Sequence, residues 1–215
     1  MNRRGLPARV NDLLVTYDEF IDELKGSSDY AVGFYPSKPR DIPIVKIGDS
    51  EDCLMIVARI HGDEPTGTEA CRRFIKSVKD HDFSFVIFPI VNTYGCEYNV
   101  RENINHNNFS ENLLDSEDYE ALALRDAVKK FTPSLILDLH NTNFLTKLSK
   151  SPKGYINPAN DERSIDTALY IKDYLESLGL SDLIREDMLP EYFLKPSRCK
   201  YYRKVTEGVF VGDER

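Results

Sequence analysis

A histidine and a glutamate three residues apart follow an apolar run of the sequence. His61 and Glu64 come shortly after the run Cys53–Val57, within Ala-Arg-Ile-His-Gly-Asp-Glu-Pro-Thr-Gly. A neutral imidazole and a carboxylate are ligands that suit zinc. A second, mostly apolar run, Leu135–Leu139, is followed by His140. We therefore predict a metal site formed by His61, Glu64 and His140, which is the ligand set of a catalytic zinc ion with one position left for water.

An acidic residue precedes the third predicted ligand. Asp138 lies two residues before His140, and alternate residues of a strand point to the same face. We therefore expect the carboxylate of Asp138 to lie beside His140 and to orient its imidazole. Pairing of Asp138 with a basic residue is the alternative.

The elements that must position these residues alternate along the chain. The predicted strands are 30–35 and 42–47, as a hairpin or edge pair, then 53–60, 83–91 and 134–139, with a last strand within 201–211. The predicted helices are 16–25, which opens with a capping box, 66–79, 119–131 and 161–178. The segments 92–112 and 141–158 are predicted loops. This order indicates an α/β layer fold, in which sites form at the carboxyl ends of strands.

The first motif resembles a known metal-binding sequence. His61-Gly-Asp-Glu64-Pro-Thr-Gly is similar to the first metal-ligand motif of the zinc carboxypeptidase superfamily. It is most similar to the branch of murein-peptide amidases and succinylglutamate desuccinylase/aspartoacylase enzymes. In that family the His and Glu of this motif bind zinc, and Asp138-Leu-His140 resembles the motif that supplies the third ligand. The resemblance implies a single α/β zinc-hydrolase domain over 1–215, with a mixed, mostly parallel sheet and helices on both faces. Residues 1–50 lie outside the recognisable motifs.

The resemblance continues in the predicted loop. Asn92-Thr-Tyr-Gly95 followed by Arg101-Glu-Asn103 is similar to the family's Asn-Pro-Tyr-Gly…Arg-x-Asn sequence. In the peptidases the matching arginine polarises the scissile carbonyl and stabilises the oxyanion, as a fixed positive charge does where negative charge develops. The resemblance thus implies this catalytic role for Arg101. A solvated surface arginine is the alternative.

The next motif departs from the family. Asn105-His-Asn-Asn-Phe109 resembles Asp-Leu-Asn-Arg-Asn-Phe, but His106 and Asn107 replace the Asn-Arg pair that anchors a substrate carboxylate. Asn107 cannot supply a charged, bidentate fork. We assign His106 and Asn107 to substrate binding, with a surface loop position as the alternative for His106, and expect poor release of C-terminal residues. Two arginines are candidates to replace the missing anchor, Arg198 and Arg203.

A carboxylate near the C-terminus completes the set of catalytic residues. The segment Lys204–Val209 resembles the short strand that carries the family's general base. Glu207 is therefore predicted to accept a proton from water and to pass it to the leaving amine. Glu191 and Glu186 compete for this role, and a solvent-facing position at a strand edge is the alternative for Glu207. The candidates for a tyrosine that caps the substrate are Tyr192, Tyr201 and Tyr202.

Composition narrows the functional class. With 215 residues and 41% apolar content the chain can bury a packed core. Its net charge of -8 argues against nucleic acid and an anionic membrane as partners. No apolar stretch follows the basic N-terminus, so neither a signal peptide nor a transmembrane helix is expected. The four cysteines contain no C-x-x-C pair, which disfavours a thiolate zinc site. We expect a cytoplasmic protein in a reducing compartment.

These features together predict a zinc-dependent hydrolase that cleaves an amide bond in a small peptide or an N-acyl amino acid. A peptidase and a deacylase would share the same metal ligands, so the sequence leaves that choice open. The other alternative is a non-catalytic, zinc-containing binding protein derived from the same fold. The departures at His106 and Asn107 keep that alternative open.

Overall fold

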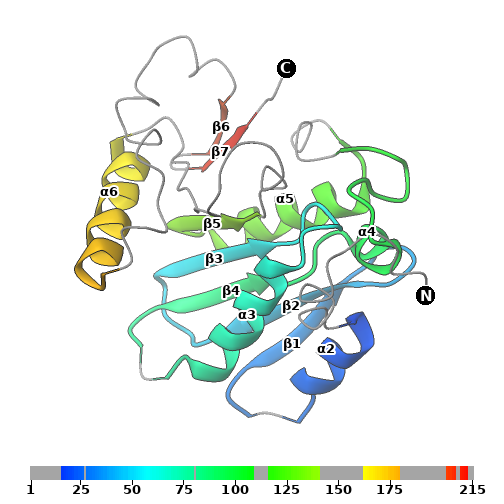
Figure 1. Ribbon diagram of the computed structural model, residues 1–215, viewed down its shortest axis with the longest axis horizontal. Coiled ribbons are helices and arrows are strands. Elements are labelled where there is room, and N and C mark those ends of the chain that lie inside the picture. Colours follow the sequence, from blue (N-terminus) through cyan, green and yellow to red (C-terminus); the bar gives the residue numbers. More distant parts are fainter. Residues whose placement is uncertain are drawn as a thin grey trace. The chain divides into compact units, whose positions relative to one another are not determined.

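The computed structural model describes most of the chain (Figure 1). The described residues are 16–26, 28–79, 81–108, 116–140, 162–179, 202–206 and 209–212. The chain forms two compact units, Met1–Asn141 and Thr142–Arg215, and each is described by itself. Folding of residues 1–215 as a single domain stays a prediction.

A mixed, five-stranded sheet forms the centre of the first unit (Figure 1). Its strands follow the order β1-β2-β4-β3-β5, with bounds β1 Ala31–Tyr35, β2 Ile42–Ile47, β3 Cys53–Ala58, β4 Ser84–Phe88 and β5 Leu135–Leu139. β2 pairs antiparallel with β1 on one side and with β4 on the other. β3 pairs parallel with both β4 and β5. The predicted α/β sheet and the β1–β2 hairpin are therefore confirmed. The parallel pairing brings the carboxyl ends of β3 and β5 to the same edge of the sheet.

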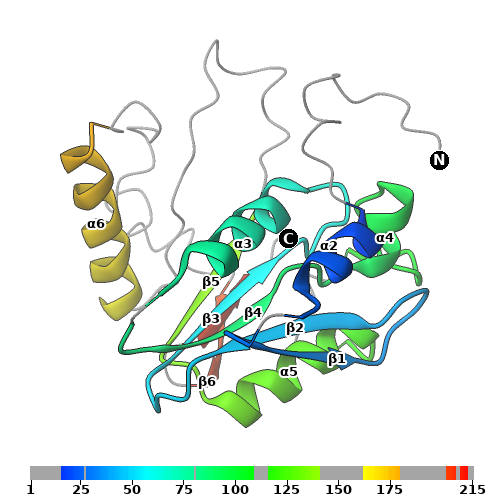
Figure 2. The ribbon, with the colours of Figure 1, turned by 90° about the horizontal axis from the view of Figure 1, so that it is seen from below.

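Helices cover both faces of this sheet, as Figure 2 shows. The helices of the first unit are α2 Tyr17–Leu24, α3 Thr66–Ser77, α4 Thr93–Tyr98 and α5 Tyr119–Phe131. Successive residues of β3 point to opposite faces, so Met55 and Val57 pack with α5, whereas Ile56 and Ala58 pack with α3. Because β3 is buried on both faces, its sequence is almost continuously apolar.

The predicted helices agree with the structure at several of their ends. Thr16 and Glu19 form the predicted capping box at the start of α2. The predicted helix 119–131 has the bounds of α5. The predicted loop 92–112 was wrong in its first part, where the six-residue helix α4 lies. A helix of less than two turns shows no apolar period, and Gly95 within it is a helix-breaking signal.

The second unit contains one helix and one hairpin among its described residues. α6 spans Glu162–Ser177, close to the predicted helix 161–178. Strand structure predicted within 201–211 is present, but the segment contains parts of two strands, β6 Tyr202–Thr206 and β7 Val209–Gly212, which pair antiparallel. Gly208 was a weak signal for a turn, since an isolated glycine in a strand pattern is equally typical of a bulge.

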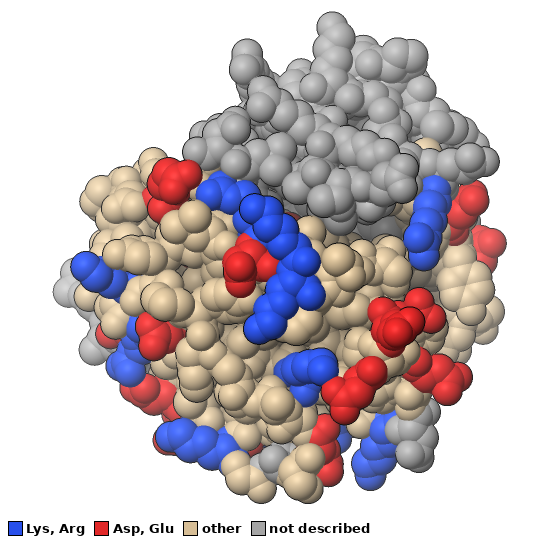
Figure 3. Space-filling model, turned by 180° about the vertical axis from the view of Figure 1, so that it is seen from behind, with Lys and Arg blue, Asp and Glu red and all other residues tan. Residues whose placement is uncertain are grey.

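The described surface carries charges of both signs, and the described cysteines are free. Acidic and basic side chains are interspersed over the face seen in Figure 3. Among the described helices, none combines the length and apolar character needed to cross a membrane. Cys53, Cys71 and Cys96 are free thiols, and burial raises the pKa of Cys71 to about 12. Cys199 lies outside the described residues.

A buried carboxylate ties α3, the helix that follows the metal motif, to α2. Glu69 accepts hydrogen bonds from Arg72 Nε at 2.6 Å and Arg73 Nε at 2.7 Å, and Arg72 also pairs with Glu23 of α2. The hydrogen bonds from Arg72, helped by Arg73 and opposed by burial, lower the pKa of Glu69 from 4.5 to about 2. The ionised form of Glu69 therefore stabilises the folded chain.

We predict that Glu69→Gln lowers the free energy of unfolding by about 2–3 kcal/mol at pH 7. Because the folded pKa lies below the unfolded pKa, this stabilisation is complete above pH 4.5 and is lost as pH falls toward 2. Urea denaturation should give a difference between variant and parent that shrinks to less than half by about pH 3. The control, Glu51→Gln at an exposed position, should be neutral at both pH values. A difference for Glu69→Gln that is the same at pH 7 and pH 3 would contradict the prediction.

Candidate metal centre

Two neighbouring parallel strands deliver the predicted metal ligands to one place. In the register of β3 and β5, Ala58 pairs with Leu139, so the residues that follow them leave the sheet side by side. His140 follows Leu139 directly, and His61 follows Ala58 after two residues. The amide of Glu64 donates to the carbonyl of His61 at 3.1 Å, which closes a tight turn just before α3. The chain thus brings together all three predicted ligands.

The three side chains converge on a small volume. His61 Nδ1 lies 2.9 Å from Glu64 Oε1, and His140 Nδ1 lies 2.9 Å from Glu64 Oε2. The two Nδ1 atoms are 3.2 Å apart. One ligand atom from each residue lies within 4.8 Å of the other two, so the group can hold a metal ion. The side chains of His61 and Glu64 are buried, whereas the imidazole of His140 is 29% exposed.

Asp138 orients the imidazole of His140. Its Oδ2 lies 2.9 Å from His140 Nε2, which leaves Nδ1 to face Glu64 and His61. Burial alone would lower the pKa of His140, but the hydrogen bonds to Asp138 and Glu64 outweigh it and raise that pKa to about 10. The surroundings of this ring therefore favour a positive charge, whether a proton or a metal ion supplies it.

The turn of His61 is pressed against α4 through two glycines. A Cβ on Gly62 would lie 2.0 Å from the carbonyl carbon of Gly95, so neither residue tolerates a side chain without backbone movement. Asn92 holds Gly95, the other residue of this contact. Its Oδ1 accepts from Gly95 N at 2.7 Å, and its Nδ2 donates to the carbonyls of Arg101 and Glu102 at 3.1 Å.

These contacts place Arg101 beside the predicted metal ligands. Its Nη1 donates to Glu64 Oε1 at 3.1 Å, and its side chain is 37% exposed. Arg101 is therefore a member of the site that retains contact with solvent. A guanidinium in this position can stabilise negative charge that develops on a ligand beside Glu64.

The loop that follows Arg101 is held by amide hydrogen bonds. Asn107 Nδ2 donates to Asp118 Oδ2 at 3.0 Å, and the Asn107 amide donates to Asn103 Oδ1 at 3.1 Å. His106 is exposed and has a positive φ of 59°. The side-chain amide of Asn107 thus binds the start of α5, where it supports the loop.

Sequence reasoning missed the buried acid beneath this loop. Glu120 is fully buried, accepts from Asn103 Nδ2 at 3.3 Å, and has a pKa raised by burial. A glutamate in the first turn of a helix is usually solvated and favourable there for the helix dipole. The sequence around Glu120 therefore gives no indication that its side chain is buried. Arg59, which is also buried, was likewise not predicted.

Several predicted residues lie outside the described part of the chain. These are Glu207, Glu191, Glu186, Arg198, Tyr192 and Tyr201. Arg203 and Tyr202 belong to β6, whose side chains are not described. The roles predicted for all of these residues stay predictions.

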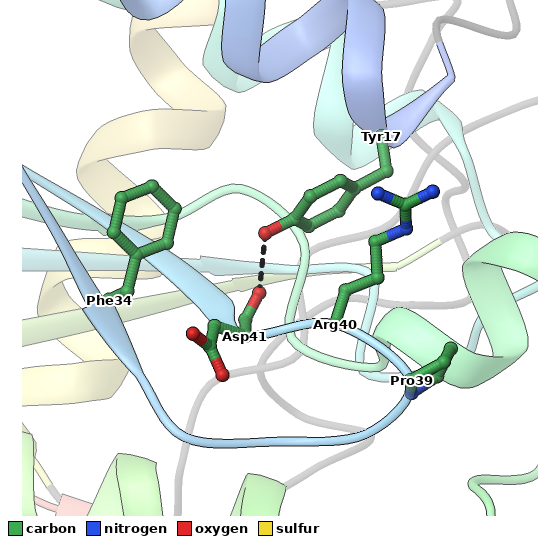
Figure 4. A pocket seen from close by; sticks show the side chains of 5 residues that line it. All are labelled: Tyr17, Phe34, Pro39, Arg40 and Asp41. Carbon is green, nitrogen blue, oxygen red and sulfur yellow. Dashed lines mark hydrogen bonds between the residues drawn. The ribbon is translucent and has the colours of Figure 1, made fainter.

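A hollow of about 360 Å³ is lined by residues that do not belong to the candidate metal centre (Figure 4). Its lining residues are Tyr17, Phe34, Pro39, Arg40 and Asp41. The hydroxyl of Tyr17 donates to the carbonyl of Asp41 at 2.6 Å, and Arg40 lies over the Tyr17 ring. Burial, followed by the charge of Asp41, raises the pKa of Tyr17 to about 12. These polar groups hold α2 against the turn between β1 and β2.

Comparison with known families identifies the family of this chain. The model of the succinylglutamate desuccinylase/aspartoacylase catalytic domain matches residues 51–171, more than half of the chain. The chain therefore belongs to the succinylglutamate desuccinylase/aspartoacylase catalytic-domain family. The matched segment contains His61, Glu64 and His140. The search of curated proteins finds no match.

Solved structures share the fold at low identity. A metallo-carboxypeptidase from Pseudomonas aeruginosa, crystallised with (2-guanidinoethylmercapto)succinic acid, is 17% identical with a TM-score of 0.61, covering 76% of this chain and 49% of its own. A metallo-carboxypeptidase from Burkholderia cenocepacia is 16% identical with a TM-score of 0.64, covering 80% of this chain and 52% of its own. The predicted carboxypeptidase-like fold is thus confirmed. The chain spans about half the length of these structures.

We predict that Gly62→Ala destabilises the protein, because the added methyl group meets backbone atoms that cannot rotate away. The free energy of unfolding should fall by about 1–3 kcal/mol, as for overpacked sites. Gly33→Ala is the matched control, since its Cβ would meet only a methyl group of Ile44 at 3.2 Å. Urea denaturation of both variants checks the prediction. Equal stability of the two variants would contradict a rigid contact between Gly62 and Gly95.

Proposed function

We propose that this protein is a zinc-dependent hydrolase that cleaves an amide bond in a small peptide or an N-acyl amino acid. The observation that carries the proposal is the convergence of two imidazole Nδ1 atoms and one carboxylate within 4.8 Å. Membership of the desuccinylase/aspartoacylase family supports the reaction class.

The donor set fits zinc. Two imidazole nitrogens and a carboxylate form a typical three-residue catalytic zinc site, whose fourth position stays free for water or substrate. Two carboxylates, Glu64 and Asp138, contact the imidazole of His140 and favour positive charge there. When bound, zinc would supply a Lewis acid that polarises a carbonyl and lowers the pKa of water.

The protein side chains take distinct roles in this proposal. His61, Glu64 and His140 hold the metal, and Asp138 fixes the imidazole of His140 with Nδ1 facing inward. Arg101 stabilises negative charge on the carbonyl oxygen of the substrate. Because Asn92 already holds the backbone at Arg101, little reorganisation is needed when that charge develops. Glu207 accepts the proton of the attacking water and transfers it to the leaving amine.

The substrate is proposed to be small and not anchored by the usual arginine. Asn107 stands where the resemblance places that arginine, and its amide is bound to Asp118. An amide lacks the charge and the forked geometry that recognise a carboxylate. This observation favours cleavage of an acyl group or a short peptide over trimming of C-terminal residues.

We also propose that the protein works in the cytoplasm. The three described cysteines are free, and two of them are buried. Free thiols are typical of reducing compartments.

We expect the purified protein to bind one zinc ion per chain. His61→Ala should abolish stoichiometric binding, because it removes a buried nitrogen ligand. His81→Ala is the control, since His81 belongs to the turn before β4 and contacts the carbonyl of Phe83. Zinc is measured by atomic emission after dialysis against zinc-containing buffer. Full zinc retention by His61→Ala would rule out the proposed ligand set.

We expect Glu207→Gln to separate zinc binding from turnover. Glutamine keeps the size of the side chain but cannot accept the proton, so turnover should fall by a factor on the order of a hundred or more. Zinc content should stay at the parental level. The assay is a screen of N-acyl amino acids and murein-type peptides. Near-normal turnover would transfer the role of base to another carboxylate, and no turnover by the zinc-loaded parent would favour a binding protein.

A further inference from the structure

Arg59 has an unusual backbone conformation directly after β3. Its φ is +57°, a left-handed value that glycine adopts freely and that other residues rarely adopt. The residue is also buried, with 3% exposure. Since a glycine would fit this turn without strain, the presence of arginine indicates that its side chain is needed here.

The side chain of Arg59 closes the turn that carries His61. Arg59 Nε donates to the carbonyl of Gly62 at 2.9 Å, and this hydrogen bond spans Ile60 and His61. The backbone carbonyl of Arg59 is also held, because it accepts from Asn92 N at 3.0 Å. The backbone of Arg59 is therefore held by Asn92, and its side chain holds the turn at Gly62.

Gly62 is fixed through both of its backbone polar groups. Its carbonyl accepts from Arg59, and its amide donates to the carbonyl of Arg101 at 3.4 Å. Its Cα also packs against Gly95. With Gly62 held on these sides, the turn fixes the direction in which the side chain of His61 leaves the backbone. That direction brings Nδ1 to 2.9 Å from Glu64.

We propose that Arg59 is a positioning residue for the metal centre, acting through its hydrogen bond to Gly62 to aim His61 Nδ1 at the metal position. The inference rests on the proposed function for its link to zinc. The charge of the guanidinium is not the useful property, because a positive charge does not attract a metal cation. The hydrogen-bond donor at the position of Nε is the useful property.

This distinction defines a matched pair of variants. In Arg59→Gln the side-chain Nε2 stands as many bonds from Cα as the arginine Nε, so the donor remains and the charge is lost. In Arg59→Met a methyl group occupies that place, so both donor and charge are lost. Zinc affinity, measured by competition with a chromogenic chelator, should weaken on the order of tenfold or more in Arg59→Met. In Arg59→Gln it should stay within about threefold of the parent.

Further variants separate positioning from stability. Thr68→Val removes another buried hydrogen bond, from Oγ1 to the carbonyl of Pro89 at 2.8 Å, without touching the turn of His61. It should lower the melting temperature and leave zinc affinity unchanged. If Arg59→Met does not fold, Arg59→Gly serves in its place, since it lacks the donor and adopts the positive φ without strain. Its zinc affinity should weaken to the same extent.

A zinc-free readout keeps the inference testable on its own. The imidazole nitrogen NMR shifts of His61 report its contact with Glu64; they should change in Arg59→Met and match the parent in Arg59→Gln. Equal zinc loss in the two variants, or stability loss alone as in Thr68→Val, would overturn the inference. If the parent binds no zinc, the proposed function fails, and the NMR comparison still decides the role of Arg59.

Discussion

Gly62 and Gly95 touch backbone to backbone, and this contact joins the turn that carries His61 to the segment that carries Arg101. Neither residue has room for a Cβ, so the distance between the two segments is set by main-chain atoms, which cannot change rotamer. Asn92 and Arg59 then complete the junction with side-chain hydrogen bonds to the carbonyls of Arg101 and Gly62. The geometry of the candidate metal centre follows from this junction and from the parallel pairing of β3 with β5.

The charged side chains of the candidate metal centre favour the binding of a cation. Glu64 is buried and lies within hydrogen-bond distance of His61, His140 and Arg101. A buried carboxylate is stable only when positive charge or donors compensate it. Asp138 adds a second carboxylate on the outer nitrogen of His140. Two carboxylates around two imidazoles therefore create a place for a cation. The Arg101 guanidinium lies beside Glu64 at 3.1 Å, where we propose that it stabilises negative charge on a substrate oxygen.

The sequence predicted those parts of the fold that depend on local patterns. Apolar runs located β3 and β5, and the histidines at their ends located the centre, since the carboxyl ends of neighbouring parallel strands meet. The helix α4 was missed because its stability comes from the side chain of Asn92 and its contact with Gly62, which apolar period does not encode. Arg59 and Glu120 were missed for a similar reason. Arginine and glutamate side chains are usually exposed. Only the structure shows that Arg59 donates a buried hydrogen bond to the carbonyl of Gly62 and that Glu120 accepts one from Asn103.

Anomalous X-ray diffraction at the zinc absorption edge, from crystals of the unaltered protein grown with zinc, tests the central claim most directly. The account predicts one anomalous peak per chain, about 2.0–2.2 Å from His61 Nδ1, His140 Nδ1 and an oxygen of Glu64. A peak bound to other residues, or no peak at these atoms in zinc-supplied crystals, would contradict it.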